Sequence, residues 1–494
     1  MEPLLTPDDC ARLRDALTAT GYTVDRVRAV VGDTAAAAMA RGELAPALRT
    51  TTGGSPLETL TRVLLLGASA PEADLAAALD PLPLPAALAA GLLAPAEGGY
   101  RAGLDLRPYG DEDGDWWVLS DLPAERHGRI RPDHVLGIGA ASLTMARATL
   151  RRPVGSALDL GVGSGVQSLH LSRHAAAVTG TDVNPRALRF AATTAALNGQ
   201  RWELLAGEWF APVAGRRFDL VVSNPPFVVG AGGSRYAYRD SGIEGDGLTR
   251  RLLAEVPGLL ADGGHAQFLA NWLHLKGEDW RDRLGPWLAA TGCDALVLQR
   301  EVVDPAEYVA TWLRDAGEDR GPEAAARAAD WLDWFEAAGA ESVAFGVVTL
   351  RRSGADDPAV RLEESREPAA HLGGEEIGGW LDREGWLRDH DLLGARLRAA
   401  PDLRLEQYAS LAADADGGWA VDDQILRLTS GLRWTAHADP VLVALVGGCD
   451  GGTPLRDLVS VLAAAYDTPE PVLAAQAVAI VTDLVVRGLL LPSE

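Results

Sequence analysis

A glycine-rich turn between two apolar stretches is the first pattern in this sequence that could do chemistry. An apolar stretch at residues 157–160 runs into the turn GVGSG at residues 161–165. Glycines let the backbone approach a ligand closely, and the start of a following helix offers free N–H groups. The next apolar stretch, residues 177–183, carries Asp182 near its end. A carboxylate there can accept hydrogen bonds from both hydroxyls of a ribose, so the pattern predicts a strand–turn–helix unit that binds a nucleotide-like cofactor.

The spacing of the glycines argues against NAD as that cofactor. They stand at Gly161, Gly163 and Gly165, whereas the dinucleotide-binding turn has the spacing G-x-G-x-x-G. A second acid, Asp159, comes just before them. The glycines alone are a weak signal, because similar turns serve several cofactors, and a generic strand–helix turn is the plain alternative.

The third pattern is the tetrad Asn224-Pro225-Pro226-Phe227, which follows an apolar stretch at residues 218–222. Two consecutive prolines stop a strand and stiffen the chain. The stiff turn would hold the Asn224 side-chain oxygen and a nearby carbonyl as two fixed acceptors, which match the two donors of a planar –NH2 group. Phe227 could stack on the same flat group. The tetrad predicts recognition of an amide or an aromatic amine, and a strand-terminating turn with a chance asparagine is the alternative.

Together these patterns resemble the class I S-adenosylmethionine-dependent methyltransferases that carry an N-P-P-[FY] motif. Enzymes of this type methylate glutamine in release factors, guanine N2 in ribosomal RNA or adenine N6 in DNA. The resemblance covers residues 131–353, under half of the chain. It implies an α/β fold with a Rossmann-like, seven-stranded methyltransferase sheet, mostly parallel with an antiparallel last strand. It also implies S-adenosyl-L-methionine as the cofactor.

The resemblance assigns roles to residues at the matching positions. In the loop D-x-G-x-G-x-G, Asp159 takes the amino-acid end of the cofactor, and Asp182 takes its ribose. Glu208 meets the adenine amino group and Trp209 flanks the ring, although Trp209 could equally be a core residue. The expected cofactor-binding set is Asp159, Gly161, Gly163, Gly165, Asp182, Val183, Glu208, Trp209 and Asn224. The expected catalytic set is Asn224, Pro225, Pro226 and Phe227.

Three neighbouring segments could complete the site. A glycine-broken segment before the first strand holds Gly137 and Ser142, which are either cofactor contacts or parts of a packing helix. After the tetrad, residues 228–247 are polar and glycine-rich. A loop beside a reacting centre is where a lid belongs, and a plain surface loop is the equal alternative. An insert at residues 303–341 is rich in aromatic residues that could contact a partner, and a helical pair packed on the sheet is expected there.

Length and composition favour a multidomain, cytoplasmic protein. The chain has 494 residues, of which 47% are hydrophobic, enough for sizeable cores. No apolar run reaches the length of a membrane span, and the first residues lack the basic-then-apolar pattern of a signal peptide. Cys10, Cys293 and Cys449 are far apart and odd in number, so neither a disulfide framework nor a zinc site is expected.

The net charge of −24 bears on the substrate. Proteins that live on nucleic acid usually carry a basic surface, so the charge favours a glutamine-like amide in a protein over ribosomal RNA. Arginines flank the core and could form a local basic patch, although ordinary solvated arginines are the favoured interpretation. They are Arg129, Arg131, Arg147, Arg151, Arg152, Arg235, Arg239, Arg250 and Arg251. A cofactor-binding interaction protein with an inert tetrad is the third hypothesis.

The regions on either side of the core complete a three-part organisation. Residues 1–130 are predicted to be mostly helical with a hairpin after residue 91, which is typical of a winged-helix-like region. DNA binding is the functional interpretation of such a region, whereas its acidity favours substrate recognition or packing. Residues 131–353 form the methyltransferase domain. Residues 356–374 are expected to be a charged linker, and residues 356–494 form a second helical, winged-helix-like region.

Overall fold

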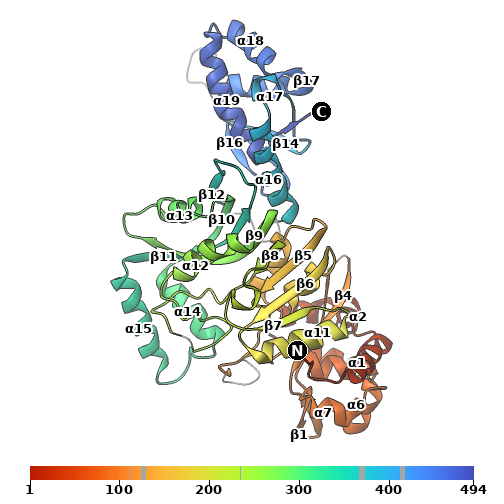
Figure 1. The fold of residues 1–494 in the computed structure, drawn as a ribbon. Helices are drawn as coiled ribbons and strands as arrows, with labels where there is room; N and C mark the ends of the chain where they lie inside the picture. The colour runs from red at the N-terminus through yellow and green to blue at the C-terminus, as the bar shows by residue number, and fades with distance from the viewer. Residues whose placement is uncertain (112, 124–129, 234, 366–372, 412–417, 494) are drawn as a thin grey trace. The chain divides into compact units, whose positions relative to one another are not determined.

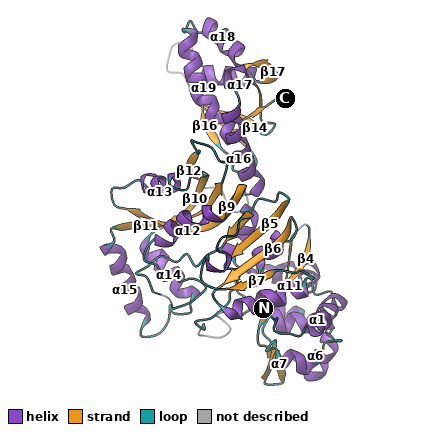
Figure 2. Cartoon of the chain, viewed as in Figure 1, coloured by secondary structure: helices purple, strands orange, loops and turns teal. Residues whose placement is uncertain are grey.

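One mixed sheet of eight strands is the central element of the structure, a computed structural model that describes residues 1–111, 113–123, 130–233, 235–365, 373–411 and 418–493 (Figures 1 and 2). The strand order is β12-β10-β11-β9-β8-β5-β6-β7. Strands β5 to β9 run parallel, and β11 is antiparallel to β9 and β10. The expected Rossmann-like α/β sheet is confirmed. Its strands are β5 (Val154–Leu160), β6 (Ala175–Asp182), β7 (Glu203–Ala206), β8 (Phe218–Ser223), β9 (Leu260–Leu275), β10 (Asp294–Val303), β11 (Ala340–Arg351) and β12 (Val360–Glu364).

The sheet has one strand more than the seven expected. Strand β12 lies at its edge, in a segment for which a charged linker was predicted. The Ala295 N–H donates to the Ala359 carbonyl (2.7 Å), and the Ala359 N–H donates to the Asp294 carboxylate (3.0 Å). Val360 and Leu362 pack against the core of the sheet. The linker prediction is wrong for this strand, because pairing with β10 outweighs its charged composition.

Side chains that alternate along β5 point to opposite faces of the sheet, and helices cover both faces. Leu158 and Leu160 lie in an apolar core with residues of α12 (Gly247–Glu255) and α13 (Trp280–Ala289). Asp159, between them, points to the other face, where its carboxylate meets Ser168 of α10 (Val166–Leu171). Helix α11 (Pro185–Leu197) packs against β6 and β7. Helices on both faces were expected and are present.

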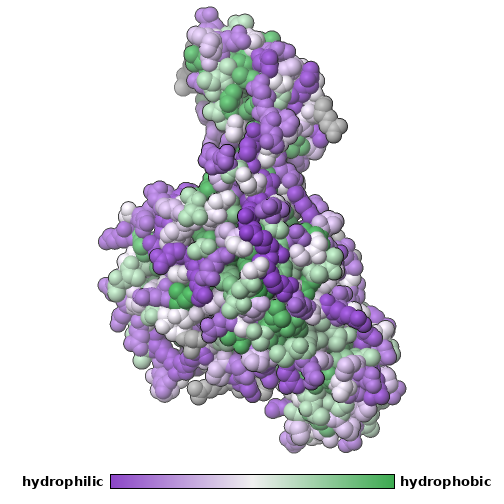
Figure 3. Space-filling view, in the orientation of Figure 1, coloured by the Kyte–Doolittle hydropathy of each residue, from purple (hydrophilic) through white to green (hydrophobic). Residues whose placement is uncertain are grey.

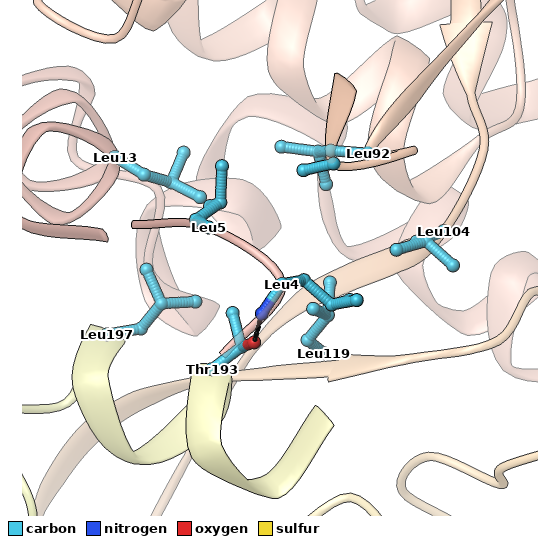
Figure 4. A pocket seen from close by; sticks show the side chains of 9 residues that line it. Leu4, Leu5, Leu13, Leu92, Leu104, Leu119, Thr193 and Leu197 are labelled. Atoms are coloured by element: carbon cyan, nitrogen blue, oxygen red, sulfur yellow. Dashed lines mark hydrogen bonds between the residues drawn. The ribbon is translucent and has the colours of Figure 1, made fainter. Parts of the chain in front are cut away.

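The N-terminal region packs on α11 and shares an apolar core with it. Phe190 and Leu197 of α11 lie in one cluster with leucines of the first helices and hairpins. The Leu4 N–H donates to Thr193 Oγ1 (2.9 Å), beside a small pocket lined mostly by leucines (Figure 4). No residue of the glycine turn or of the tetrad lines this pocket. It is an apolar packing seam between this region and α11.

Helices followed by a hairpin make up this N-terminal region, as predicted. Helices α3 and α4 form in the alanine-rich residues 33–50, which show little apolar periodicity. The winged-helix-like assignment stays a prediction. The elements are α1 (Pro7–Thr20), α2 (Val24–Val31), α3 (Asp33–Ala40), α4 (Ala45–Thr50), α5 (Pro56–Leu60), a π-helical turn (Thr61–Leu65), α6 (Glu72–Leu79), α7 (Leu84–Ala89), β1 (Leu93–Ala96), β2 (Gly99–Ala102), β3 (Asp105–Asp111) and β4 (Gly114–Ser120).

The chain divides into two compact units. Residues 1–146 and 152–363 form one, and residues 147–151 with 364–494 form the other. The second unit has its own apolar core and two three-stranded sheets, β17-β13-β18 and β14-β15-β16, so it holds more strand than expected. The domain boundaries near residues 130 and 356 stay predictions. Its elements are α16 (Gly374–Asp389), β13 (Arg396–Ala399), β14 (Leu403–Leu411), β15 (Trp419–Leu428), β16 (Thr435–His437), α17 (Pro440–Gly448), β17 (Asp450–Pro454), α18 (Leu455–Ala465), α19 (Glu470–Arg487) and β18 (Leu490–Pro492).

Hydrophilic residues cover most of the face shown in Figure 3, with hydrophobic residues in small groups between them. Within the described ranges, none of the helices combines the length and the apolar character needed to cross a membrane.

Candidate cofactor and acceptor site

Three neighbouring strand ends bring the predicted site residues together. Leu160 of β5 pairs with Thr181 of β6 on one side and with Ser223 of β8 on the other. The glycine turn, Asp182 and the tetrad therefore leave adjacent strands at the same level. The Ser223 hydroxyl donates to the Leu160 carbonyl (2.7 Å) and ties two of these ends. Ligands of open α/β sheets bind at this edge, beyond the carboxyl ends of the strands.

The glycine turn needs glycine for two different reasons. Gly161, Gly163 and Gly165 have φ values of +83°, +52° and +87°, which side chains other than glycine rarely adopt. A Cβ atom added at Gly161 or Gly163 would meet nothing within 4 Å, so the turn is open there. A Cβ atom at Gly165 would come within 2.6 Å of the Trp202 ring. Two glycines thus leave room for a ligand, while the third allows close packing.

Asp182 supports the glycine turn as well as facing the site. Its carboxylate accepts the Gly163 N–H (3.0 Å) and the Asn184 N–H (2.8 Å), one on each oxygen. Burial raises the pKa of Asp182, and these backbone hydrogen bonds oppose that shift. Each carboxylate oxygen still has lone-pair capacity for another donor. The carboxylate is thus held in place while retaining room for the two ribose hydroxyls that the sequence assigns to it.

Asp159 is a fully enclosed carboxylate at the end of β5. Its side chain is 1% exposed and accepts a hydrogen bond from the Ser168 hydroxyl (2.7 Å). Burial raises the pKa of Asp159 to about 7; the Ser168 bonds lower it and the nearby Asp182 charge adds to the rise. Ser168 was not predicted from the sequence, although its place in the first turn after the glycines could have suggested it. A cation brought close to Asp159 would favour its ionised form.

Three further residues of the expected cofactor-binding set, Val183, Glu208 and Trp209, lie just beyond the ends of β6 and β7. Val183 directly follows β6 and is 54% exposed, and Glu208 is exposed. Trp209 has a φ of +46°, a strained conformation for a bulky residue. It packs against the core that contains α12, with the Arg251 guanidinium 5.2 Å from its ring centroid. Trp209 is therefore partly a packing residue.

Asn224 is the polar side chain of the tetrad that the structure leaves unengaged. It is half-buried and makes no hydrogen bond with any described residue. Pro225 behind it is buried. Phe227 meets the rings of Trp312 and Phe345 edge-on, with centroids 6.1 and 6.3 Å away. A stiff, anchored turn thus presents one amide that can both donate and accept.

Gly137 and Ser142, in the segment before β5, make packing contacts within the domain. Ser142, in α9 (Ala140–Ala148), is buried, and its hydroxyl accepts the Gly139 N–H (3.1 Å). Its carbonyl accepts a hydrogen bond from Gln167 (2.9 Å). A Cβ atom at Gly137 would lie 2.5 Å from the Ser120 hydroxyl. These contacts support the packing interpretation of both residues.

Helices of the aromatic insert anchor the loop that follows the tetrad. The insert forms α14 (Pro305–Asp315) and α15 (Ala324–Ala337), which pack on β11, so the helical pair is confirmed. Hydrogen bonds join the loop to this pair and to the turn between its helices. They run from the Tyr236 hydroxyl to Glu318 (2.7 Å), from the Tyr238 hydroxyl to Asp315 (2.7 Å) and from Arg239 Nη1 to the Trp312 carbonyl (2.5 Å). These hydrogen bonds fix the described residues of the loop to the helical insert.

Four of the nine flanking arginines form ion pairs with carboxylates in the described part of the chain. The pairs are Arg131 with Asp133 (2.8 Å), Arg235 with Glu318 (2.9 Å), Arg239 with Asp240 (3.1 Å) and Arg251 with Glu255 (2.8 Å). Arg129 lies outside the described residues. The four paired arginines thus have a counter-charge, but Arg239 is 6% exposed, so the interpretation as an ordinary solvated arginine is wrong for it.

Comparison with known proteins identifies the family of the part of the chain that carries this site. Residues 137–276 match the family model "Methyltransferase small domain". This part of the chain is a class I S-adenosylmethionine-dependent methyltransferase domain. Its cofactor is S-adenosyl-L-methionine, and the open glycine turn, Asp182 and the buried Asp159 fit that molecule. Two further models, described as domains of unknown function (DUF7059 and DUF7782), match residues 19–103 and 378–492.

The curated relatives of the methyltransferase domain are named for different acceptors. A ribosomal RNA small subunit methyltransferase C of Alcanivorax borkumensis is 35% identical over 145 residues, which are 29% of this chain and 39% of that protein. A release factor glutamine methyltransferase of Geobacter sulfurreducens is 34% identical, over 27% of this chain and 52% of that protein. A ribosomal protein uL3 glutamine methyltransferase of Bradyrhizobium diazoefficiens is 31% identical, over 29% and 48%. The chain thus spans about half, or less, of each relative.

Solved structures align over a similar share of the chain. A T. thermophilus 16S rRNA methyltransferase in complex with AdoMet and guanosine aligns with 40% of this chain and 52% of that protein, at 17% identity and a TM-score of 0.27.

Proposed function

We propose that this protein transfers a methyl group from S-adenosyl-L-methionine to a planar amide or amino nitrogen, and that the acceptor is a glutamine-like amide of a cytoplasmic protein. The observation that carries the proposal is the half-buried Asn224, whose amide has no partner among the described residues. It stands on a proline-stiffened turn beside the glycine turn of the cofactor site.

The residues divide the work between cofactor and acceptor. The bound cofactor supplies an electrophilic methyl group. Asp159, Asp182 and the glycine turn hold the cofactor, with Asp182 kept in place by the Gly163 and Asn184 N–H groups. Asn224 accepts a hydrogen bond from the acceptor –NH2 and aligns its lone pair, and alignment is the main contribution a protein makes to such a transfer. Accepting that bond also makes the delocalised lone pair more available as the new bond forms.

The surroundings of the tetrad favour a protein acceptor. Four of the nine flanking arginines are paired with carboxylates, namely Asp133, Glu318, Asp240 and Glu255. Binding to a nucleic acid backbone needs basic side chains that can replace counterions, and the chain carries a net charge of −24. Two of the three relatives described above are named as glutamine methyltransferases.

Ribosomal RNA is the second candidate acceptor. The relative with 35% identity is named as a ribosomal RNA small subunit methyltransferase. In that case the flanking regions would hold the RNA, and a guanine or adenine would be turned out of its stack to place its amino group at Asn224.

A labelling experiment separates these alternatives. The purified protein is incubated with tritiated S-adenosylmethionine and a ribosome-containing lysate from a strain that lacks the gene, and the products are treated with protease or with ribonuclease. We expect label that protease releases and that appears as methylglutamine after enzymatic digestion to amino acids. Label that only ribonuclease releases would replace the protein acceptor with RNA. Incorporation no higher than with Asn224→Ala in every fraction would contradict the proposed activity.

A further inference from the structure

Both backbone polar groups of Val229, two residues beyond the tetrad, are held by side chains of the helical insert. The Val229 N–H donates to the Tyr308 hydroxyl (2.8 Å), and Trp331 Nε1–H donates to the Val229 carbonyl (3.0 Å). Val229 itself is buried and belongs to no helix or strand. Tyr308 lies in α14 and Trp331 in α15. The insert therefore supplies the bonds that regular structure would otherwise supply to this backbone.

Tyr308 is itself fixed to the central sheet. Its hydroxyl also accepts a hydrogen bond from Asn271 Nδ2 (3.0 Å), and Asn271 lies in β9. Asn271 is directly opposite Phe345 of β11, whose ring meets both Tyr308 (5.8 Å) and Phe227 (6.3 Å). The Tyr308 ring is 1% exposed. One rigid side chain thus links the middle of the sheet to the backbone that leaves the tetrad.

The returning half of the loop is fixed by the same helix. Phe227 forms a backbone bridge with Asp240, and the Val228 N–H donates to the Arg239 carbonyl (3.0 Å). Arg239 in turn donates through Nη1 to the Trp312 carbonyl of α14 (2.5 Å). The chain segments on both sides of the Phe227–Asp240 bridge are therefore held in place by contacts with α14.

We infer that the α14–α15 pair positions the acceptor site at the tetrad, and that Tyr308 is its main positioning residue. The inference rests on the proposed function for what this site does, but the contacts that carry it do not involve substrate. Two prolines stiffen the tetrad, yet a stiff turn presents Asn224 accurately only if the chain beyond it is also fixed. Tyr308 touches neither cofactor nor acceptor in this scheme, so it acts through Val229 and the Phe227 ring.

Burial raises the pKa of the Tyr308 phenol, so the phenol is neutral at neutral pH, where its oxygen accepts the Val229 N–H.

The test compares two hydroxyl deletions in the full-length chain. Tyr308→Phe removes the hydrogen bonds to Val229 and to Asn271 and keeps the ring. Tyr238→Phe is the matched control, because it also removes a tyrosine hydroxyl that joins the loop to α14, but at the exposed Asp315. Hydrogen–deuterium exchange over residues 227–233 reports the positioning directly, and calorimetry with S-adenosylmethionine reports the cofactor site. Single-turnover methyl transfer into the labelled lysate fraction reports the consequence.

We expect Tyr308→Phe to speed exchange over residues 227–233 while exchange over the glycine turn and the cofactor affinity stay unchanged. Methyl transfer should slow by up to about a hundredfold, the effect of a misplacement of about 1 Å. Tyr238→Phe should change none of these. Unchanged exchange in Tyr308→Phe, equal changes in both variants, or faster exchange with full transfer would each overturn the inference.

Two outcomes distinguish a failure of the proposed function, or a loss of the fold, from a failure of the role of Tyr308. If the wild-type protein labels no fraction, the proposed function fails, whereas the exchange measurement still decides whether Tyr308 holds Val229. If Tyr308→Phe speeds exchange across the whole sheet, the variant has lost its fold. Trp331→Phe, which removes the bond to the Val229 carbonyl, then decides by the same measurements.

Discussion

Asp159 should make the affinity for the cofactor depend on pH near neutrality. The carboxylate is enclosed at the end of β5, and burial raises its pKa to about 7. The cofactor carries a positively charged amino group, and the resemblance to methyltransferases places that group at Asp159. An ammonium next to the carboxylate stabilises its ionised form. Binding therefore requires Asp159 to lose its proton, and acid should weaken the complex.

The size of this effect follows from the pKa. With a pKa of about 7, roughly three quarters of Asp159 is ionised at pH 7.5 and about one eleventh at pH 6, so the affinity should fall about eightfold between them. Below pH 6 the loss should approach about tenfold per unit, or about 1.4 kcal/mol. Ser168→Ala should move the midpoint upward, because the Ser168 hydrogen bonds lower the pKa of Asp159.

Without cofactor, the same group affects stability with the opposite sign. The folded state holds the Asp159 proton more tightly than an unfolded chain, in which an aspartate has a pKa of about 3.9. This contribution to the free energy of unfolding is complete below about pH 4 and is lost as the pH rises to about 7. Asp159→Asn cannot lose this proton, so its free energy of unfolding should rise relative to that of the wild type over this range.

Calorimetric titration with S-adenosylmethionine between pH 5.5 and 7.5 tests the reasoning. Asp159→Asn should bind more weakly than the wild type at pH 7.5 and show a flat profile. A wild-type affinity that does not change over this pH range, or an Asp159→Asn variant that keeps the wild-type pH dependence, would show that Asp159 does not control binding.

Three further predictions concern the remaining parts of the site. Asp182→Ala should weaken cofactor binding by about 1–3 kcal/mol, the effect of a lost hydrogen-bonding partner in a buried site, and calorimetry showing full affinity would mean that the ribose site is misplaced. Asn224→Ala should leave cofactor affinity unchanged while single-turnover transfer falls about a hundredfold to a thousandfold; Asn224→Asp should retain more activity, and an unimpaired alanine variant would contradict the proposed role. A chain that ends at Glu363 should still bind cofactor in calorimetry, and loss of binding in a folded truncated protein would show that the C-terminal region contributes to the site.

Local signals in the sequence were sufficient to predict the strands, the turn and the helices that frame the site. The turn at residues 161–165 needs glycine, because three of its positions have positive φ. Asn184 caps α11 through its side chain and Pro185 starts it, and both are signals that a sequence alone shows. The prolines of the tetrad end β8 where expected. Each of these rules acts within a few residues, so it can be applied to a sequence alone.

Contacts between distant segments decided the rest. The charged residues of β12 form a strand only because β10 offers an edge with which they can pair. The raised pKa of Asp159 depends on burial by the whole domain, and the pairing of Arg235 with Glu318 joins segments that are far apart in the sequence. Val229 is held by two side chains that lie 79 and 102 residues further along the chain. The sequence determined which groups could bind a cofactor and an amide, whereas burial and long-range pairing determined how rigidly and in which protonation state they are presented.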